Sequence, residues 1–142
     1  MYGGSVFTGW GGACSGFGAC TVVLDQARSV TARFSRVFTD PALTPRPSIV
    51  RAAHFTELRG AIDTLRARQA LAAFGWTDPI LAAGATTIKQ VHLAELCTAL
   101  AAVYAARGLA SPAWTDARIA PAATVVRAIH ITELRVAVLA LE

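Results

Sequence analysis

Histidine and glutamate recur three residues apart in three copies of one phrase, His-x-x-Glu-Leu. The copies begin at His54, His92 and His130, so consecutive copies lie 38 residues apart. On an α-helix, side chains at i and i+3 lie on the same side, so the imidazole and carboxylate of one phrase can reach one metal ion. The same groups serve as general acids and bases. The phrase therefore raises the question of metal or acid–base chemistry.

A catalytic hypothesis follows if the three repeats surround a pseudo-threefold axis. His54, His92 and His130 would then supply three nitrogen ligands to one divalent ion, zinc or calcium, and an open position could activate water. Glu57, Glu95 or Glu133 would act as general base. This arrangement suits a small metal-dependent hydrolase of an ester or lactone. In a linear stack the histidines would lie about 10 Å apart and could not share an ion.

A structural hypothesis follows from the apolar stripe that contains each histidine, in the first copy with Leu58, Ala61 and Leu65. A histidine in such a stripe is usually a core residue whose ring nitrogens are hydrogen-bonded. Strict repetition also favours packing over catalysis, because active sites are usually asymmetric. We therefore predict a polar latch between neighbouring repeats, made by His54, Glu57, His92, Glu95, His130, Glu133, Asp40, Asp78 and Asp116. This interpretation assigns no catalytic, cofactor-binding or metal-ligating residue.

A second phrase keeps the same pitch and defines the repeat boundaries. An aromatic residue followed by Thr-Asp begins at Phe38, Trp76 and Trp114. The predicted domain 37–142 therefore holds three units of about 38 residues, which are 38–75, 76–113 and 114–142. We expect one long helix per unit, over approximately 50–70, 88–107 and 125–141, each preceded by a loop rich in proline, glycine or alanine, at 44–47, 83–85 and 120–122.

Helix-terminal signals accompany these segments. Ser48, Thr87 and Thr124 are expected at or near the N-caps, and Gly75 and Gly108 at or just past helix ends. The arginines are expected at helix starts and on outer faces, whereas Cys97, which takes an arginine position of the repeat, is expected to be a small buried residue.

Residues 1–36 favour a small antiparallel β meander. Strands are predicted at 6–8, 21–24 and 29–34, with a glycine-rich loop at 9–12 between the first two. Cys14 and Cys20 are six residues apart, which a hairpin can bridge, so we predict a disulfide and an oxidising compartment. The alternative, half of a metal site, lacks a second cysteine pair or nearby histidine. The expected fold class is α+β, mostly α.

Two segments resemble known sequences. Residues 7–22, with their Gly-Trp and paired cysteines, followed by residues 29–34, resemble the end of a divergent internalin-type B repeat. This resemblance implies a β module of secreted or surface bacterial proteins, and a chain that is part of a longer secreted protein. The His-x-x-Glu-Leu-Arg units resemble uncharacterised tandem repeats in large secreted proteins of soil bacteria, which implies a location more than an activity.

Composition restricts the partners. Apolar residues make up 54% of the 142 residues and charged residues 15%, so the chain should fold. The net charge of +4 comes from scattered arginines rather than a basic stripe, which argues against nucleic acid. No apolar run reaches the roughly 18 residues of a membrane span, and no signal peptide is visible.

The sequence thus predicts a non-catalytic extracellular module that serves structure, attachment or binding in a larger secreted bacterial protein. Its partner would be a protein or glycan at the cell surface, and no cofactor is expected. A homodimer is an open alternative, because the short last unit leaves an apolar end that a second copy could cover. The metal-dependent hydrolase remains the alternative function.

Overall fold

The computed structural model describes residues 4–44, 48–116, 118–119 and 124–142. Two strands and three helices occur in these ranges, so the predicted class, α+β and mostly α, is confirmed at that level. The chain forms two compact units, Met1–Phe38 and Thr39–Glu142. None of the described helices combines the length and apolar character that a membrane span needs.

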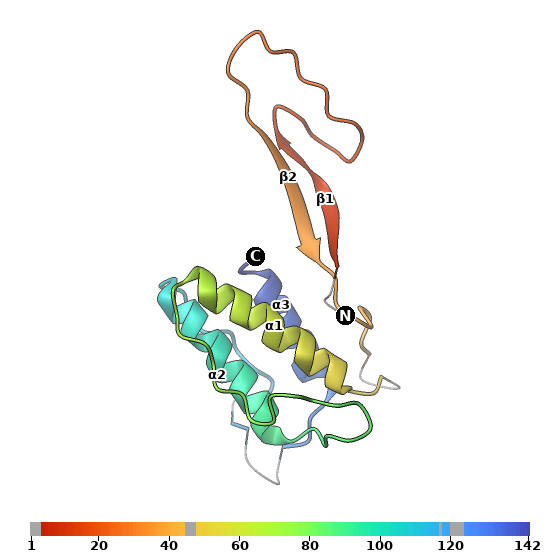
Figure 1. The fold of residues 1–142 in the computed structure, drawn as a ribbon, viewed down its shortest axis with the longest axis vertical. Helices are drawn as coiled ribbons and strands as arrows, with labels where there is room; N and C mark the ends of the chain where they lie inside the picture. Colours follow the sequence, from red (N-terminus) through yellow and green to blue (C-terminus); the bar gives the residue numbers. More distant parts are fainter. Residues whose placement is uncertain (1–3, 45–47, 117, 120–123) are drawn as a thin grey trace. The chain divides into compact units, whose positions relative to one another are not determined.

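The N-terminal unit is a two-stranded antiparallel ribbon (Figure 1). Strand β1 (Ser5–Gly12) pairs with β2 (Val30–Arg36), from Ser5 opposite Arg36 to Gly12 opposite Val30. The register shifts between Phe7 and Gly9, whose φ of 125° suits only glycine. Around Phe7, the rings of Trp10, Phe17 and Phe34 pack edge-on.

The ribbon differs from the predicted meander in two places. The expected loop 9–12 belongs to β1, and the expected strand 21–24 lies in the segment that connects β1 to β2. Val23 and Leu24 are 74% and 84% exposed, so their side chains have no packed surface of the kind that favours strand formation. The predicted Cys14–Cys20 disulfide is present.

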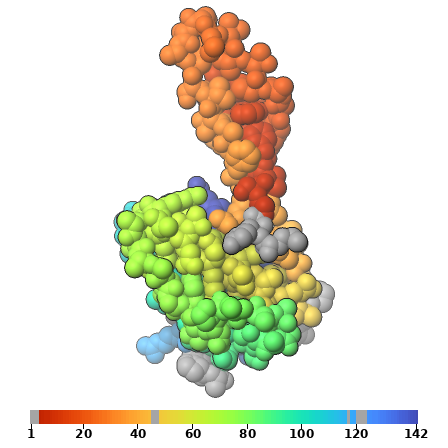
Figure 2. All heavy atoms as spheres, in the orientation of Figure 1, coloured from red at the N-terminus to blue at the C-terminus, as the bar shows by residue number. Residues whose placement is uncertain are grey.

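The C-terminal unit contains α1 (Ala52–Arg68), α2 (Gln90–Ala106) and α3 (Ala128–Leu139). All three helices run in the same direction, and long segments return along the outside (Figure 1). Val50, Ile88 and Val126 precede the three helices and line one hollow of about 310 Å³, so the helix N-termini lie together. On the face in Figure 2, the surface of this unit is formed largely by α1 and the segment between α1 and α2.

The core is built from equivalent positions of the three helices. The predicted stripe is buried, with Leu58, Leu96 and Leu134 each 0% exposed. A second row, which the stripe did not include, is buried beside it: Phe55, Leu93, Ile131, Ile62, Leu100 and Val138. Each helix therefore buries a face wide enough to contact both of the others.

The helices start later than predicted, and no serine or threonine caps them. Arg51, Lys89 and Arg127 occupy the N-cap positions. The Ser48 hydroxyl instead accepts the N–H of Thr44 at 2.8 Å. The predicted loops at 45–47 and 120–122 lie outside the described residues.

Each of the first two helices is followed, at the equivalent position of its repeat, by a residue whose φ lies in the left-handed region. Gly108 has φ 67°, as predicted, but its counterpart is Ala70 at φ 53°, while Gly75 lies beyond the end of α1. Both termini make the same closing bonds, from Leu71 N–H to the Arg66 carbonyl and from Leu109 N–H to the Tyr104 carbonyl.

This pair yields a prediction. A left-handed conformation costs a non-glycine residue about 1–2 kcal/mol, and glycine loses about 0.5–1 kcal/mol more entropy on folding. Ala70→Gly should therefore raise the free energy of unfolding by about 0.5–1 kcal/mol, measured by urea denaturation with far-UV circular dichroism. Gly108→Ala, where the added methyl group meets open space, should lower it by a similar amount. Equal signs for the two changes would contradict the assignment.

Candidate functional site

The three repeated histidines are buried and have both ring nitrogens hydrogen-bonded. His54 and His92 are 0% exposed and His130 is 4% exposed. Each is the third residue of its helix. Nδ1 accepts the backbone N–H of the N-cap residue, at 3.1 Å from Arg51, 3.2 Å from Lys89 and 3.1 Å from Arg127. Nε2 lies 3.1, 3.0 and 2.7 Å from Oδ2 of Asp40, Asp78 and Asp116, respectively.

These contacts determine the tautomer. Because Nδ1 accepts a hydrogen bond, the proton of the neutral ring must reside on Nε2, which donates to the aspartate. The imidazole thus acts as a rigid spacer between a helix N-terminus and the loop that carries the aspartate. No ring lone pair remains to ligate an ion in this arrangement.

The aspartates adopt an uncommon backbone conformation. Asp40 and Asp78 have φ of 49° and 48°, in the left-handed region that aspartate tolerates better than most residues. A hydrogen bond from Lys89, and next one from His92, lower the pKa of Asp78. Arg127, and next His130, lower the pKa of Asp116 in the same way. The carboxylates of Asp78 and Asp116 are therefore each held in the charged form by one exposed and one buried donor.

Each glutamate of the phrase holds the aromatic-Thr-Asp segment of its own repeat. Glu57 accepts the backbone N–H of Thr39 at 3.0 Å and its hydroxyl, and Glu133 accepts both groups of Thr115, with the N–H at 3.1 Å. Glu95 accepts the N–H of Thr77 at 2.9 Å. Histidine and glutamate thus anchor adjacent residues of the same segment.

Two buried arginines make hydrogen bonds from one repeat to the Thr-Asp segment of another. Arg59 on α1 donates to the carbonyls of Thr77 and Asp78, both at 2.8 Å, and its guanidinium lies 3.5 Å from the Glu95 carboxylate. We call this arrangement, one guanidinium on two carbonyls beside a glutamate, an arginine bridge. Burial lowers the pKa of Arg59, and the nearby Glu95 opposes that shift.

A second arginine bridge joins the last repeat to the first. Arg135 on α3 donates to the carbonyls of Asp40 and Thr39, at 2.9 and 2.5 Å, and lies 3.9 Å from Glu57. Burial also lowers the pKa of Arg135. The arginine bridges therefore connect the first repeat to both of the others.

These contacts revise the predicted placement of the polar residues. All nine predicted latch residues take part in the network, but their His–Asp and Glu–Thr bonds lie within one repeat. The bonds to the Thr-Asp segment of another repeat come from Arg59 and Arg135, which were expected on outer faces yet are only 5% and 6% exposed. The sequence did contain an indication of this role, because arginine follows Glu-Leu in the first and third copies of the phrase. The charge of arginine nevertheless suggested that its side chain would be exposed to solvent.

The alternative metal hypothesis required the three imidazoles to share an ion. Among the residues that the structure describes, no group of three or more histidine, cysteine, aspartate or glutamate side chains could hold a metal ion. Each imidazole instead faces the aspartate of its own repeat.

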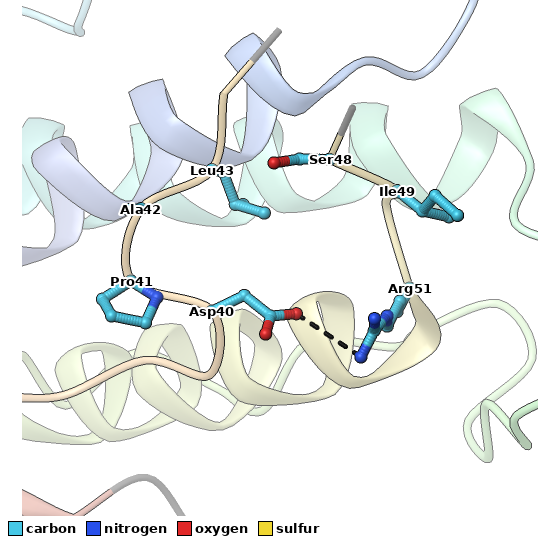
Figure 3. A pocket seen from close by; sticks show the side chains of 7 residues that line it. All are labelled: Asp40, Pro41, Ala42, Leu43, Ser48, Ile49 and Arg51. Carbon is cyan, nitrogen blue, oxygen red and sulfur yellow. Dashed lines mark ion pairs between the residues drawn. The ribbon is translucent and has the colours of Figure 1, made fainter. Parts of the chain in front are cut away.

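A hollow of about 370 Å³ lies beside the first His–Asp pair (Figure 3). Asp40, Pro41 and Leu43 line one side and Ser48, Ile49 and Arg51 the other, with Arg51 3.6 Å from Asp40. The Ser48 hydroxyl is bonded to Thr44, whereas His54 is bonded to Asp40, so these two side chains do not form the serine–histidine pair that activates a nucleophile. The hollow offers an ion pair and apolar walls.

Comparisons with protein-family models, with curated proteins and with solved structures give no match to this chain.

The first arginine bridge gives a stability prediction. Arg59→Ala should lower the free energy of unfolding by about 2–3 kcal/mol, because two carbonyls lose charge-assisted hydrogen bonds. Arg59→Lys should recover only part of this, because an ammonium lacks the planar fork. The control is Arg127→Ala, which removes a half-exposed ion pair worth less than about 1 kcal/mol. Urea denaturation measures all three, and similar losses in Arg59→Ala and Arg127→Ala would contradict the role of the bridge.

The aspartates give a pH prediction. Their folded pKa lies below the unfolded value of about 3.9, so they stabilise the fold above that pH. As the pH falls below it, the unfolded state takes up protons first, and the stabilisation disappears as the pH passes the folded pKa. Wild type should therefore lose more stability between about pH 5 and about pH 3 than the double variant Asp78→Asn, Asp116→Asn. Equal losses in urea denaturation would refute this contribution.

Proposed function

We propose that this chain is a non-catalytic extracellular module that provides structure, attachment or binding within a larger secreted bacterial protein. Residues 39–142 would act as a helical repeat array closed on itself, and the disulfide-linked ribbon would precede it. The observation that carries the proposal is the use of the repeated groups. Each imidazole, each phrase carboxylate and each partner aspartate is already bonded to a structural element of the chain.

Repetition supports this role over catalysis. The three His–Asp–N-cap arrangements are equivalent, and their Nε2–Oδ2 distances span only 2.7 to 3.1 Å. An active site needs one place where different groups converge on a substrate. Three equivalent arrangements at separate helix N-termini suit a scaffold in which every repeat presents its loop in the same way.

The arginine bridges support closure within one chain. Arg135 bonds to Thr39 and Asp40, so the last repeat contacts the first although it is shorter than the others. This contact favours a self-contained array over the alternative in which a second copy completes the third unit. The proposed partner is a protein or glycan at a cell surface.

The extracellular setting rests on the Cys14–Cys20 disulfide, since such bonds persist mainly in oxidising compartments. The disulfide also closes the loop next to the aromatic residues of the ribbon. A secreted module exposed to an uncontrolled environment would benefit from such a covalent link, because a two-stranded ribbon alone is only marginally stable.

The decisive experiment asks whether the histidines support structure or bind a metal. The ¹⁵N spectrum of the imidazoles should show the Nε2–H tautomer at all three positions, unchanged by zinc, calcium or a chelator. His92→Ala should lower the free energy of unfolding by about 2–4 kcal/mol, since a buried hydrogen-bonded ring is lost. Thr98→Ala on the exposed side of α2 is the matched control and should change it little.

The competing function predicts different results. A metal-dependent hydrolase would purify with stoichiometric metal and cleave a generic ester or lactone. Its turnover would be lost with a chelator and in His92→Ala. Either bound metal at the imidazoles or such turnover would overturn the proposed function.

A further inference from the structure

Among the residues that the structure describes, the contact between α2 and α3, which we call the α2–α3 joint, has no counterpart of the two arginine bridges at the α1–α2 and α3–α1 joints. Cys97 on α2 occupies the repeat position of Arg59 and Arg135. A cysteine side chain is far too short to reach the carbonyls of the next repeat and lacks the donors of a guanidinium. Cys97 is half-buried, and burial, and next the charge of Glu133, raise its pKa to about 12. The thiol therefore lies near the carboxylate that would flank a guanidinium.

The residues whose groups would accept the missing bridge nevertheless keep the bonds that hold their counterparts in the other repeats. In the other joints the accepting groups are the carbonyls of a Thr-Asp pair and the glutamate that holds this pair. Here the same groups belong to Thr115, Asp116 and Glu133. Thr115 N–H donates to Glu133 at 3.1 Å, and His130 bonds Asp116 at 2.7 Å, as in the first two repeats. We call these three acceptors the guanidinium cradle.

A hollow beside the cradle is the second observation. It measures about 300 Å³ and is lined by Tyr104, Trp114, Glu133, Val136 and Ala137, with Pro112 and others. At the α1–α2 joint the equivalent space holds the Phe74 ring, packed 4.6 Å from Trp76 and covered by Arg66. Here Pro112 stands at the Phe74 position and provides no ring beside Trp114. Tyr104, at the Arg66 position, donates its hydroxyl to the Ala137 carbonyl at 2.9 Å, as Arg66 does to Ala99, and lines the hollow. Glu133 belongs both to the cradle and to the wall of the hollow.

Trp114, on the wall of the hollow, would also suit a guanidinium group. At the α1–α2 joint the Arg59 guanidinium lies 5.0 Å from the centre of the Trp76 ring. Trp114 is the equivalent residue at the α2–α3 joint and lines the hollow. A cation in the cradle would thus meet an indole ring, a carboxylate and two carbonyls, the same set that surrounds Arg59.

We propose that the α2–α3 joint is a binding site for a guanidinium group, carried by an external ligand. The guanidinium would donate to the carbonyls of Thr115 and Asp116, pair with Glu133 and lie against Trp114, while the apolar stem of the ligand fills the hollow. This inference deepens the proposed binding role by naming the ligand chemistry.

The geometry favours guanidinium over ammonium. Two neighbouring carbonyls are matched by two parallel N–H donors on one planar group, whereas an ammonium is a point charge without that fork. The ligand group could belong to a small molecule or to an exposed arginine side chain of a peptide. The two sources share the same chemistry and are separated by the test.

The test titrates the full chain with agmatine, which is a guanidinium on an apolar stem, and follows the indole signal of Trp114 and the amide of Thr115 by NMR. Putrescine is the matched ammonium control. We expect saturable shifts at both residues with agmatine and about tenfold weaker binding of putrescine. A short peptide with one central arginine, run alongside, should bind more tightly than agmatine only if the natural source is a peptide.

Variants locate the site. Cys97→Arg places the chain's own guanidinium in the cradle, so it should reduce agmatine binding about tenfold or more and raise the melting temperature. Cys97→Ser is the matched control and should bind as wild type does. Glu133→Gln should weaken binding about tenfold without added stability, because it removes the charge that pairs with the ligand.

Absence of saturable shifts, equal binding of putrescine, or unchanged binding in Cys97→Arg would each overturn the proposal. These outcomes leave the structural function intact, because that function is judged by the imidazole tautomers and metal content. Conversely, metal at the histidines would overturn the proposed function without affecting agmatine binding at the cradle.

Discussion

The C-terminal unit depends on a buried imidazole that links a helix start to a loop. At an α-helix N-terminus, the first backbone N–H groups have no partner within the helix, and a serine or aspartate side chain usually supplies one. Here the third residue of the helix supplies the acceptor instead, since Nδ1 of His92 accepts the N–H of the N-cap residue Lys89. The opposite nitrogen bonds Asp78. One side chain therefore caps the helix, fills the core beside Leu96 and fixes the position of an aspartate in a strained conformation.

The arginine bridges depend on this arrangement. The carbonyls of Thr77 and Asp78 can receive Arg59 only because His92 and Glu95 hold that segment in place. A buried guanidinium is costly unless its donors are satisfied, so its burial is favourable only against acceptors that are already oriented. Bonds within a repeat thus prepare the surface that the neighbouring repeat recognises. This hierarchy explains why histidine, glutamate and arginine recur as one phrase rather than as separate features.

The sequence predicted those features that come from periodicity. The pitch of 38 residues located three helices, and the spacing of His54, Leu58 and Ala61 identified a buried stripe. It also predicted Asp40, Asp78 and Asp116 as partners of the histidines. Periodicity indicated buried, hydrogen-bonded rings, but it could not predict that each ring bonds the backbone N–H of its own N-cap residue, or that Arg59 and Arg135 are buried. Those outcomes depend on long-range contacts between residues up to 96 positions apart, as between Arg135 and Thr39.

In the ribbon, local β-propensity at residues 21–24 predicted a strand. Such propensity favours a strand only where the side chains can pack on a neighbouring surface, and Val23 and Leu24 are exposed.

Departures from the repeat are therefore more informative about function than the repeat itself. Where every copy has the same residue, packing accounts for it, and the residue carries no information about a ligand. Cys97, Tyr104 and Pro112 depart together, and all three lie at the joint between α2 and α3. Cys97 and Pro112 lack the guanidinium of Arg59 and the ring of Phe74. Tyr104 makes with the Ala137 carbonyl the bond that Arg66 makes with the Ala99 carbonyl. The residues of the guanidinium cradle, Thr115, Asp116 and Glu133, are kept in the bonded geometry of the other repeats. The cradle and the hollow share one residue, because Glu133, which holds Thr115, also lines the hollow. The joint between α2 and α3 is therefore where we place the proposed guanidinium site.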